Sequence, residues 1–292
     1  MTYPSDAARR SVTLATARPL LAYHGRVVAR AFAGNGSQGE DHGPVPNLWL
    51  NEFNWGGNWE GPETWPEERN GVLRGLLWVS YYLAAAQQHT AQGAPATYAA
   101  LHWYSLFSQP YPQWGQEAAV AGVGESSNAT SAITVNGVAQ IFAHVAHVSL
   151  RRNFTHMAPW NDSSARTLEL DVLGEGSQPC LQAAVLTSNT NSTSRAFLLL
   201  NVCARNVTAH LPLGHLGAAT LRTCTYSAAA DRAPEGLGFV PLAQINSVAA
   251  PPWQNGPLDV VTAAVQVRGG GGDGGCAPLN LGALSFVVAE TA

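Results

Sequence analysis

The chain has 292 residues, enough for one large domain or two ordinary ones, and its 46% hydrophobic and 12% charged content excludes a disordered chain. Its net charge of −4 excludes a broad basic field that would attract nucleic acid or anionic membranes. All 15 basic residues are arginine, which excludes chemistry that needs a lysine amine, such as a Schiff base. No apolar stretch reaches the roughly 18 residues of a membrane-spanning helix.

Residues 1–152 alternate helical and extended patterns. Apolar residues recur at helical spacing and predict helices over 5–32, 70–89 and 131–152. Short apolar runs predict buried strands over 47–53 and 97–107. Alternation of helix and strand in this order is typical of a parallel α/β fold.

From about residue 160 the pattern becomes one of short strands separated by turns, which is typical of an antiparallel β-sandwich. The predicted strands cover 166–173, 181–189, 195–204, 207–213, 219–228, 260–268 and 283–290. The glycine-rich run 269–276 is predicted to be a linker, because no helix follows it to make a phosphate site. We therefore expect two domains, 1–152 and 153–292.

Glu52 closes the first predicted strand. The apolar run 48–50 leads directly into Asn51 and Glu52, and ligands of parallel α/β folds lie at the carboxyl ends of the strands. A glutamate there is placed for chemistry, although a glutamate that only pairs with an arginine gives the same pattern.

Aromatic residues gather around this strand end. Seven of the nine tryptophans lie between residues 49 and 114, and indole faces suit the stacking of sugar rings. In the second strand, alternation places His102 and Tyr104 on one face and Leu101 and Trp103 on the other, and either pair fits a cleft or a core. The candidates for substrate binding are Asn54, Trp55, Trp59, His102, Trp103 and Tyr104.

The order of these motifs resembles the C-terminal half of clan-A glycoside hydrolases. The motifs are LWLNEFNW, a helix, ALHWYSLF, a second helix, a β-sandwich and the closing strand LGALSFVVAE. The similarity is nearest to α-L-arabinofuranosidases, with β-xylosidases and heparanase or β-glucuronidase types close behind. The resemblance implies the C-terminal part of a (β/α)8 TIM barrel, with 47–53 and 98–106 as barrel strands seven and eight, followed by an antiparallel β-sandwich.

The resemblance also implies a reaction. Glu52 matches the nucleophile of a retaining glycosidase, which forms a covalent glycosyl-enzyme that water then hydrolyses. Asn51 and Glu52 also look like the Asn-Glu pair that carries the acid/base on strand four of this clan, but a position two strands before a sandwich favours the nucleophile. The implied substrates are O-glycosides of plant or cell-wall polysaccharides or of glycoconjugates, and no cofactor is implied.

The acid/base is not found in this chain. In the family pattern it comes from strand four, and nothing before Glu52 has that form. A complete (β/α)8 barrel takes about 250 residues, whereas residues 1–152 precede the sandwich. We therefore expect a fragment whose N-terminal part is missing.

Sequons and cysteines indicate the secretory pathway. Six Asn-X-Ser/Thr sequons occur where composition predicts about two by chance, at Asn35, Asn128, Asn153, Asn161, Asn191 and Asn206. Cys180, Cys203, Cys224 and Cys276 lack the CxxC spacing of a zinc site and are disulfide candidates, with three pairings possible for two bridges. The N-terminus is too polar for a secretory signal, so we expect a secreted protein whose signal is missing.

The sequence gives weaker support for other sites and functions. His144 and His147 are three residues apart on a predicted helix, but no third metal ligand is in view, so no metal site is expected. No GxSxG motif supports a serine nucleophile. The alternatives to an enzyme are a non-catalytic secreted carbohydrate-binding protein and a cell-wall glycoprotein whose sandwich is an interaction module. Sugar specificity and oligomeric state are left open.

Overall fold

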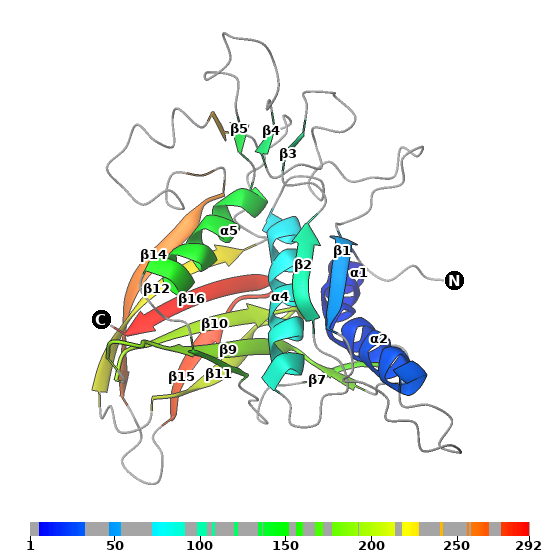
Figure 1. Cartoon of the computed structure of the whole chain (residues 1–292). Helices are drawn as coiled ribbons and strands as arrows, with labels where there is room; N and C mark the ends of the chain where they lie inside the picture. Colours follow the sequence, from blue (N-terminus) through cyan, green and yellow to red (C-terminus); the bar gives the residue numbers. More distant parts are fainter. Residues whose placement is uncertain are drawn as a thin grey trace.

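The protein mixes helices with parallel and antiparallel sheets (Figure 1). The structure is a computed structural model. It describes residues 6–32, 47–53, 72–90, 98–103, 107–108, 120–121, 134–135, 137–151, 156–159, 167–171, 177–191, 193–213, 218–227, 240–241, 256, 258–268 and 276–291.

The predicted N-terminal helix is in fact two helices, α1 (Asp6–Ala15) and α2 (Ala17–Phe32). Thr16 separates them, and its hydroxyl donates to the carbonyl of Val12 at 2.8 Å. Such side-chain bonds to the preceding turn compete with regular helix geometry. Pro19 stands in the first turn of α2, where its missing N–H leaves no helical bond unmade. A new helix therefore starts at Ala17.

A short parallel sheet follows. Strand β1 (Leu48–Phe53) pairs in parallel with β2 (Tyr98–Trp103), and α4 (Val72–Thr90) lies between them in sequence. This is the β-α-β arrangement that the alternating pattern predicted. Strand β2 is shorter than the predicted 97–107, since Phe107–Ser108 forms a separate strand, β3.

The last helix of the first half also starts later than predicted. Residues Thr134–Val135 form strand β5, and α5 (Gly137–Ala146) begins after it and continues as a π-helical turn, His147–Arg151. The prediction of helix at 131–136 was therefore wrong at Thr134 and Val135, two β-branched residues that suit a strand. Strand β5 joins β3, β4 (Val120–Ala121) and β13 (Val240–Pro241) in a small sheet.

A six-stranded antiparallel sheet forms the centre of the second half, in the order β14-β12-β16-β10-β9-β6. Its strands are β6 (His156–Pro159), β9 (Leu181–Thr187), β10 (Arg195–Asn201), β12 (Ala218–Ser227), β14 (Val260–Arg268) and β16 (Ser285–Thr291). The continuous apolar runs of β10 and β16 are explained by burial on both faces.

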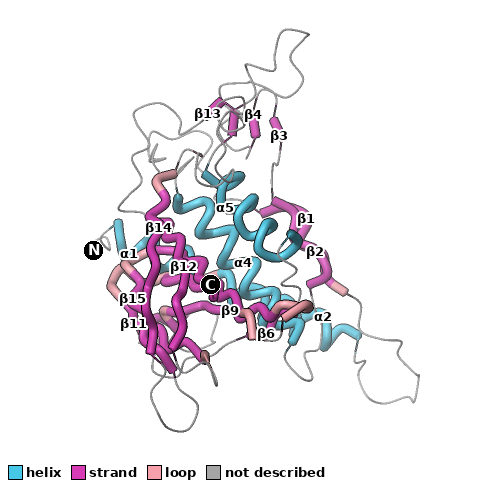
Figure 2. Tube along the Cα trace, turned by 90° about the vertical axis from the view of Figure 1, so that its left-hand side faces the viewer, coloured by secondary structure: helices cyan, strands magenta, loops and turns pink. Residues whose placement is uncertain are grey.

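The two faces of this sheet pack against different elements. Leu198 and Leu200 point into a core shared with helices α4 and α5, whereas Phe197 and Leu199 point into a second core. That second core is closed by the antiparallel pair of β11 (Val207–Pro212) and β15 (Cys276–Leu281). Figures 1 and 2 show the resulting layers of helices, sheet and second sheet.

The sequence analysis did not predict β15, because Pro278 and the preceding glycines obscure its strand pattern. Strands β7 (Thr167–Asp171) and β8 (Ser177–Pro179) form a separate pair.

The helices and the large sheet share one continuous core. It contains Leu76 and Leu83 of α4, Ile141 of α5 and Phe286 of β16, all fully buried. Each such side chain contributes about 1.5–3 kcal/mol when removed from water. Helices α4 and α5 approach closely because residue 75 is glycine, where a Cβ would overlap the side chain of Ile141. Trp78 of α4 is also buried in this cluster.

Three buried polar links tie the helices to the second half. Ser80 Oγ lies 2.7 Å from the carbonyl of Leu14 and 3.0 Å from Oε1 of Gln182. The amide of Gln140 pairs with both backbone groups of Leu258, at 3.0 and 2.7 Å. His144 Nδ1 lies 2.9 Å from the hydroxyl of Tyr226. In the described part of the chain, no helix combines the length and hydropathy needed to cross a membrane.

Candidate active site

Glu52 lies near the carboxyl end of β1, beside an irregularity in the strand pairing. Leu50 is opposite Leu101, but the next pair is Phe53 with Trp103, so β1 contains one extra residue between them. Such bulges are over-represented next to active sites, where they redirect a side chain. The backbone at Glu52 therefore departs from regular strand geometry at the position where the sequence predicts chemistry.

The two faces of the β1–β2 sheet differ. Leu50 and Leu101 are half-buried against α2 and α4. On the other face, Trp49 is 67% exposed and stacks with exposed His102, their ring centroids 5.9 Å apart and their planes at 22°. The stacked pair forms an exposed aromatic surface on this face of the sheet.

His102 is the predicted substrate-binding residue that the structure describes in full. The backbones of Glu52 and Trp103 are described as strand, and their side chains lie outside the described residues. Asn54, Trp55, Trp59 and Tyr104 lie outside them altogether. Trp49 was missed as a partner of His102, although the alternation of exposed and buried positions along β1 carries the signal for it.

The helix-facing side of this sheet holds a structural contact. The hydroxyl of Tyr98 lies 3.2 Å from Nδ1 of His24 on α2. Burial, with a smaller effect of Tyr81, raises the pKa of Tyr98 to about 12. Tyr98 therefore keeps its proton and acts as a neutral hydrogen-bonding group that joins β2 to α2.

His144, considered with His147 for a metal, lies in the core. His144 is 1% exposed and contacts Tyr226, with the rings 5.8 Å apart. Burial, with a smaller effect of His147, lowers the pKa of His144 to about 3. Within the described ranges no group of three His, Cys, Asp or Glu side chains is placed to hold a metal ion.

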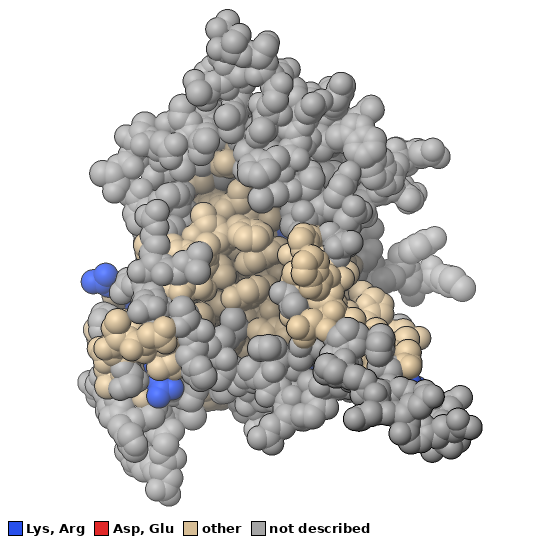
Figure 3. Space-filling model, viewed as in Figure 1, with Lys and Arg blue, Asp and Glu red and all other residues tan. Residues whose placement is uncertain are grey.

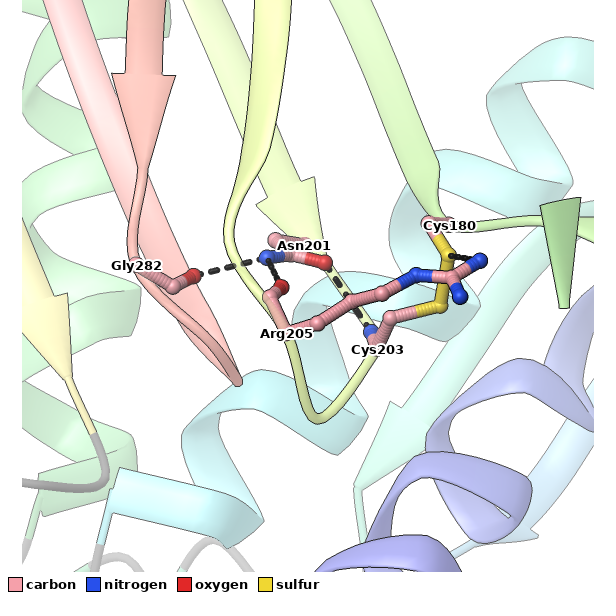
Figure 4. The surroundings of a disulfide bond; sticks show 5 residues. All are labelled: Cys180, Asn201, Cys203, Arg205 and Gly282. Carbon is pink, nitrogen blue, oxygen red and sulfur yellow. Dashed lines mark hydrogen bonds between the residues drawn. A yellow bond between two sulfur atoms is a disulfide. The ribbon is translucent and has the colours of Figure 1, made fainter. Parts of the chain in front are cut away.

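Of the three cysteine pairings left open, the structure contains the bond between Cys180 and Cys203 (Figure 4). The buried side chain of Asn201 organises the turn that holds it. Asn201 Nδ2 donates to the carbonyls of Arg205 and Gly282, each at 2.7 Å, and Oδ1 accepts from the amide of Cys203 at 3.0 Å. Cys224 is free, while the side chain of Cys276 lies outside the described residues.

Two of the six sequons fall in the described part of the chain. Asn191 is exposed in the β9–β10 turn, where its Oδ1 accepts from the amide and hydroxyl of Thr193 at 3.0 and 2.7 Å. Asn206 is exposed before β11, and its Oδ1 accepts from the amide of Ala283 at 3.1 Å. Asn35, Asn128, Asn153 and Asn161 lie outside the described residues.

The described surface over the helices on the face seen in Figure 3 is mostly uncharged, with arginine atoms at its margins.

The sequence matches no protein-family model and no curated protein. The chain has a clan-A glycoside-hydrolase-like fold.

This fold likeness comes from solved structures. An arabinofuranosidase aligns over 99% of this chain and 51% of its own length, at 14% identity and a TM-score of 0.55. A family 51 α-L-arabinofuranosidase from Bifidobacterium longum aligns over 99% and 50%, at 14% identity and 0.54. The family 51 enzyme from Thermotoga petrophila RKU-1 aligns over 94% and 48%, at 14% identity and 0.53. The chain thus spans about half the length of the structures it matches.

Proposed function

We propose that this chain carries the nucleophile of a retaining glycoside hydrolase, with Glu52 as that nucleophile. In this proposal residues 1–152 are the last part of a (β/α)8 barrel and residues 153–292 are the β-sandwich beside it. The likeness in fold to the arabinofuranosidases supports both parts. The single observation that carries the assignment of Glu52 is its place beside the bulge at the carboxyl end of β1.

The register of the sheet supports the placement of position 52. Phe53 is opposite Trp103, so position 52 lies between this pair and the pair of Leu50 with Leu101. The exposed face of the sheet next to it carries Trp49 and His102. In a (β/α)8 barrel the face away from the helices is the interior, so this face is the one from which a catalytic carboxylate works.

The chemistry requires two carboxyl groups. The Glu52 carboxylate attacks the anomeric carbon as the glycosidic C–O bond breaks, and a second carboxylic acid protonates the leaving oxygen. Water, deprotonated by that second group, then cleaves the glycosyl-enzyme ester with retention. The two groups must lie about 5–5.5 Å apart. We propose that polypeptide beyond residues 1–292 supplies the acid/base, in line with the half-length alignments.

The proposed ligand is a carbohydrate, as an O-glycoside of plant or cell-wall polysaccharide or of a glycoconjugate. The stacked and exposed Trp49 and His102 supply a flat aromatic surface on the proposed interior face. The disulfide between Cys180 and Cys203 supports folding in an oxidising compartment, and hence a secreted glycoprotein.

The test is covalent labelling of the native protein with cyclophellitol-type or 2-fluoroglycoside probes bearing arabinosyl, xylosyl or glucuronyl groups. We expect one probe to add its mass to the peptide that contains Glu52. Glu52→Gln should abolish labelling, and the matched change Glu63→Gln, on the same segment, should not. Labelling of another residue would assign the nucleophile to that residue instead. No labelling with any probe, while glycans still bind, would indicate a carbohydrate-binding protein without catalysis.

A further inference from the structure

The turn between β9 and β10 carries one of the two described sequons at the tip of a hairpin. The two strands pair antiparallel from Thr187 and Arg195, so the sequon lies in the connection between these residues. Asn191 and Thr193, the two residues that define the sequon, are both exposed. An N-glycosylation acceptor needs an asparagine and a hydroxyl residue two positions later on an accessible segment. This turn meets that requirement in the folded chain.

The polar groups of this turn bond to one another. Ser188 Oγ accepts from the amides of Thr190 and Asn191, at 3.2 and 3.3 Å. The carbonyl of Asn191 accepts from the amide of Ser194 at 3.0 Å, and its Oδ1 accepts from the amide and hydroxyl of Thr193. Each of these bonds begins and ends within the turn. An enzyme can therefore bind the sequon without opening the sheet.

The second described sequon is held by tertiary contacts instead. Asn206 immediately precedes β11, and the middle residue, Val207, is 5% exposed and belongs to the second core. The hydroxyl of Thr208 donates to Oδ1 of Asn280 on β15 at 2.8 Å. Oδ1 of Asn206 accepts from the amide of Ala283 at 3.1 Å. To present this sequon to an enzyme, β11 must separate from β15, which is a local unfolding step with its own cost in free energy.

We propose that Asn191 is a glycan acceptor that stays competent after the chain has folded, whereas folding closes the sequon at Asn206. In the reaction, Asn191 Nδ2 bonds to C1 of an oligosaccharide as the bond from C1 to the pyrophosphate of a lipid carrier breaks. The amide loses one proton to a base of the transferase. The inference rests on the proposed passage through the secretory pathway, where such a transferase acts.

The hairpin has room for the glycan. The turn lies at one end of the β9–β10 pair, and the disulfide between Cys180 and Cys203 lies at the other end. A glycan at Asn191 therefore extends from the tip into solvent and leaves the disulfide-linked turn undisturbed.

The test uses the full-length chain, purified without glycans in its folded, disulfide-bonded form. It is incubated with an oligosaccharyltransferase and a lipid-pyrophosphate-linked oligosaccharide, and the rate of modification at each asparagine is measured from the masses of proteolytic peptides. Synthetic peptides of residues 186–196 and 203–211 serve as unfolded references. Thr193→Ala removes the hydroxyl of the sequon, and Thr190→Ala, at an exposed threonine of the same turn, is the matched control that keeps the sequon.

We expect Asn191 of the folded chain to react within about threefold of its peptide, and Asn206 to react about tenfold or more slowly than its peptide. Thr193→Ala should abolish the reaction at Asn191, Thr190→Ala should retain it, and both variants should unfold at the wild-type temperature. An unmodified Asn191 in the folded chain, beside a reactive peptide, overturns the proposal. Reaction of Asn206 at the rate of its peptide overturns its second half. Because all components are purified, neither failure bears on whether the native chain enters the secretory pathway.

Discussion

His144 on α5 and Tyr226 on β12 share a buried hydrogen bond of 2.9 Å that joins the helical layer to the six-stranded sheet. The two residues lie 82 positions apart in the chain and on either side of the predicted domain boundary. Tyr226 also stacks on Phe286, so the pair is fixed within the shared core. The two halves are therefore joined by specific polar contacts as well as by apolar packing.

Tyr226→Phe should lower the free energy of unfolding by about 1–3 kcal/mol, because it removes the hydroxyl from a buried pair and keeps the ring. Urea denaturation at pH 7 measures this change. Tyr23→Phe is the matched control, since Tyr23 is 45% exposed and its change should stay within about 0.5 kcal/mol. Equal effects of the two substitutions would contradict the role of the pair.

His144 should make stability fall as the pH falls below about 6.5. Its pKa in the folded state is lowered to about 3 by burial, whereas an unfolded chain has the ordinary value of about 6.5. Between these values the unfolded state binds a proton that the folded state does not, so stability falls by about 1.4 kcal/mol per pH unit.

The measurement compares the pH dependence of urea unfolding between the wild type and His144→Gln. Carboxylates contribute equally to both proteins, so the difference in slope between pH 6 and pH 4 isolates His144. Identical slopes would mean that His144 is not buried in its neutral form.

The thiol count should separate the cysteine pairings. The register pairs Cys224 with Val288, which belongs to the core on the helix side, whereas β15, which begins at Cys276, packs on the opposite face of the sheet. Alkylation of the denatured, unreduced protein should therefore label two thiols, at Cys224 and Cys276. In the native protein Cys224 should react slowly, because burial, with a smaller effect of Glu290, raises its pKa to about 11. No labelling at all would indicate a second disulfide.

Removal of the disulfide should be costly. The bond closes a loop with a sequence separation of 23 residues, so Cys180→Ser/Cys203→Ser should lower the free energy of unfolding by about 3–4 kcal/mol. Cys224→Ser is the control and should have a much smaller effect. A double variant as stable as the wild type would contradict the bond.

Asn201→Ala should also destabilise strongly, by about 2–4 kcal/mol, because Asn201 is fully buried and the change removes its three hydrogen bonds. Thermal or chemical unfolding checks this, with exposed Asn280→Ala as the comparison. If Asn201→Ala were as mild as Asn280→Ala, the turn would be held by the disulfide alone.

The two faces of β1 should respond differently to truncation. Leu50→Ala should cost about 2 kcal/mol or more, since Leu50 packs against α2 and α4. Trp49→Ala should change the stability of the 292-residue chain by less than about 0.5 kcal/mol, since Trp49 is 67% exposed. A reversed order would mean that β1 presents the opposite face to the helices, and the position assigned to Glu52 would change with it.

By itself the sequence determined the local elements with strong periodicity. The patterns at 47–53, 70–89, 181–189, 195–204 and 283–290 predict strands and a helix that the structure contains with slightly different ends, because alternation and helical spacing are local signals. The order of the motifs also led to the glycosidase fold, which the comparisons with solved structures bear out at the level of fold.

Only the tertiary structure decided which distant residues meet. The choice of Cys203 for Cys180, the contact of His144 with Tyr226 and the stacking of Trp49 on His102 all depend on packing between elements far apart in the chain. Tertiary or side-chain contacts also overrode the local sequence pattern at two places. At Thr16 a side-chain hydrogen bond to the carbonyl of Val12 divides the predicted helix. Strand β15 forms by pairing with β11 although its own strand pattern is weak. The extra residue beside Glu52 belongs to the same class, since a bulge exists only relative to the strand that it pairs with.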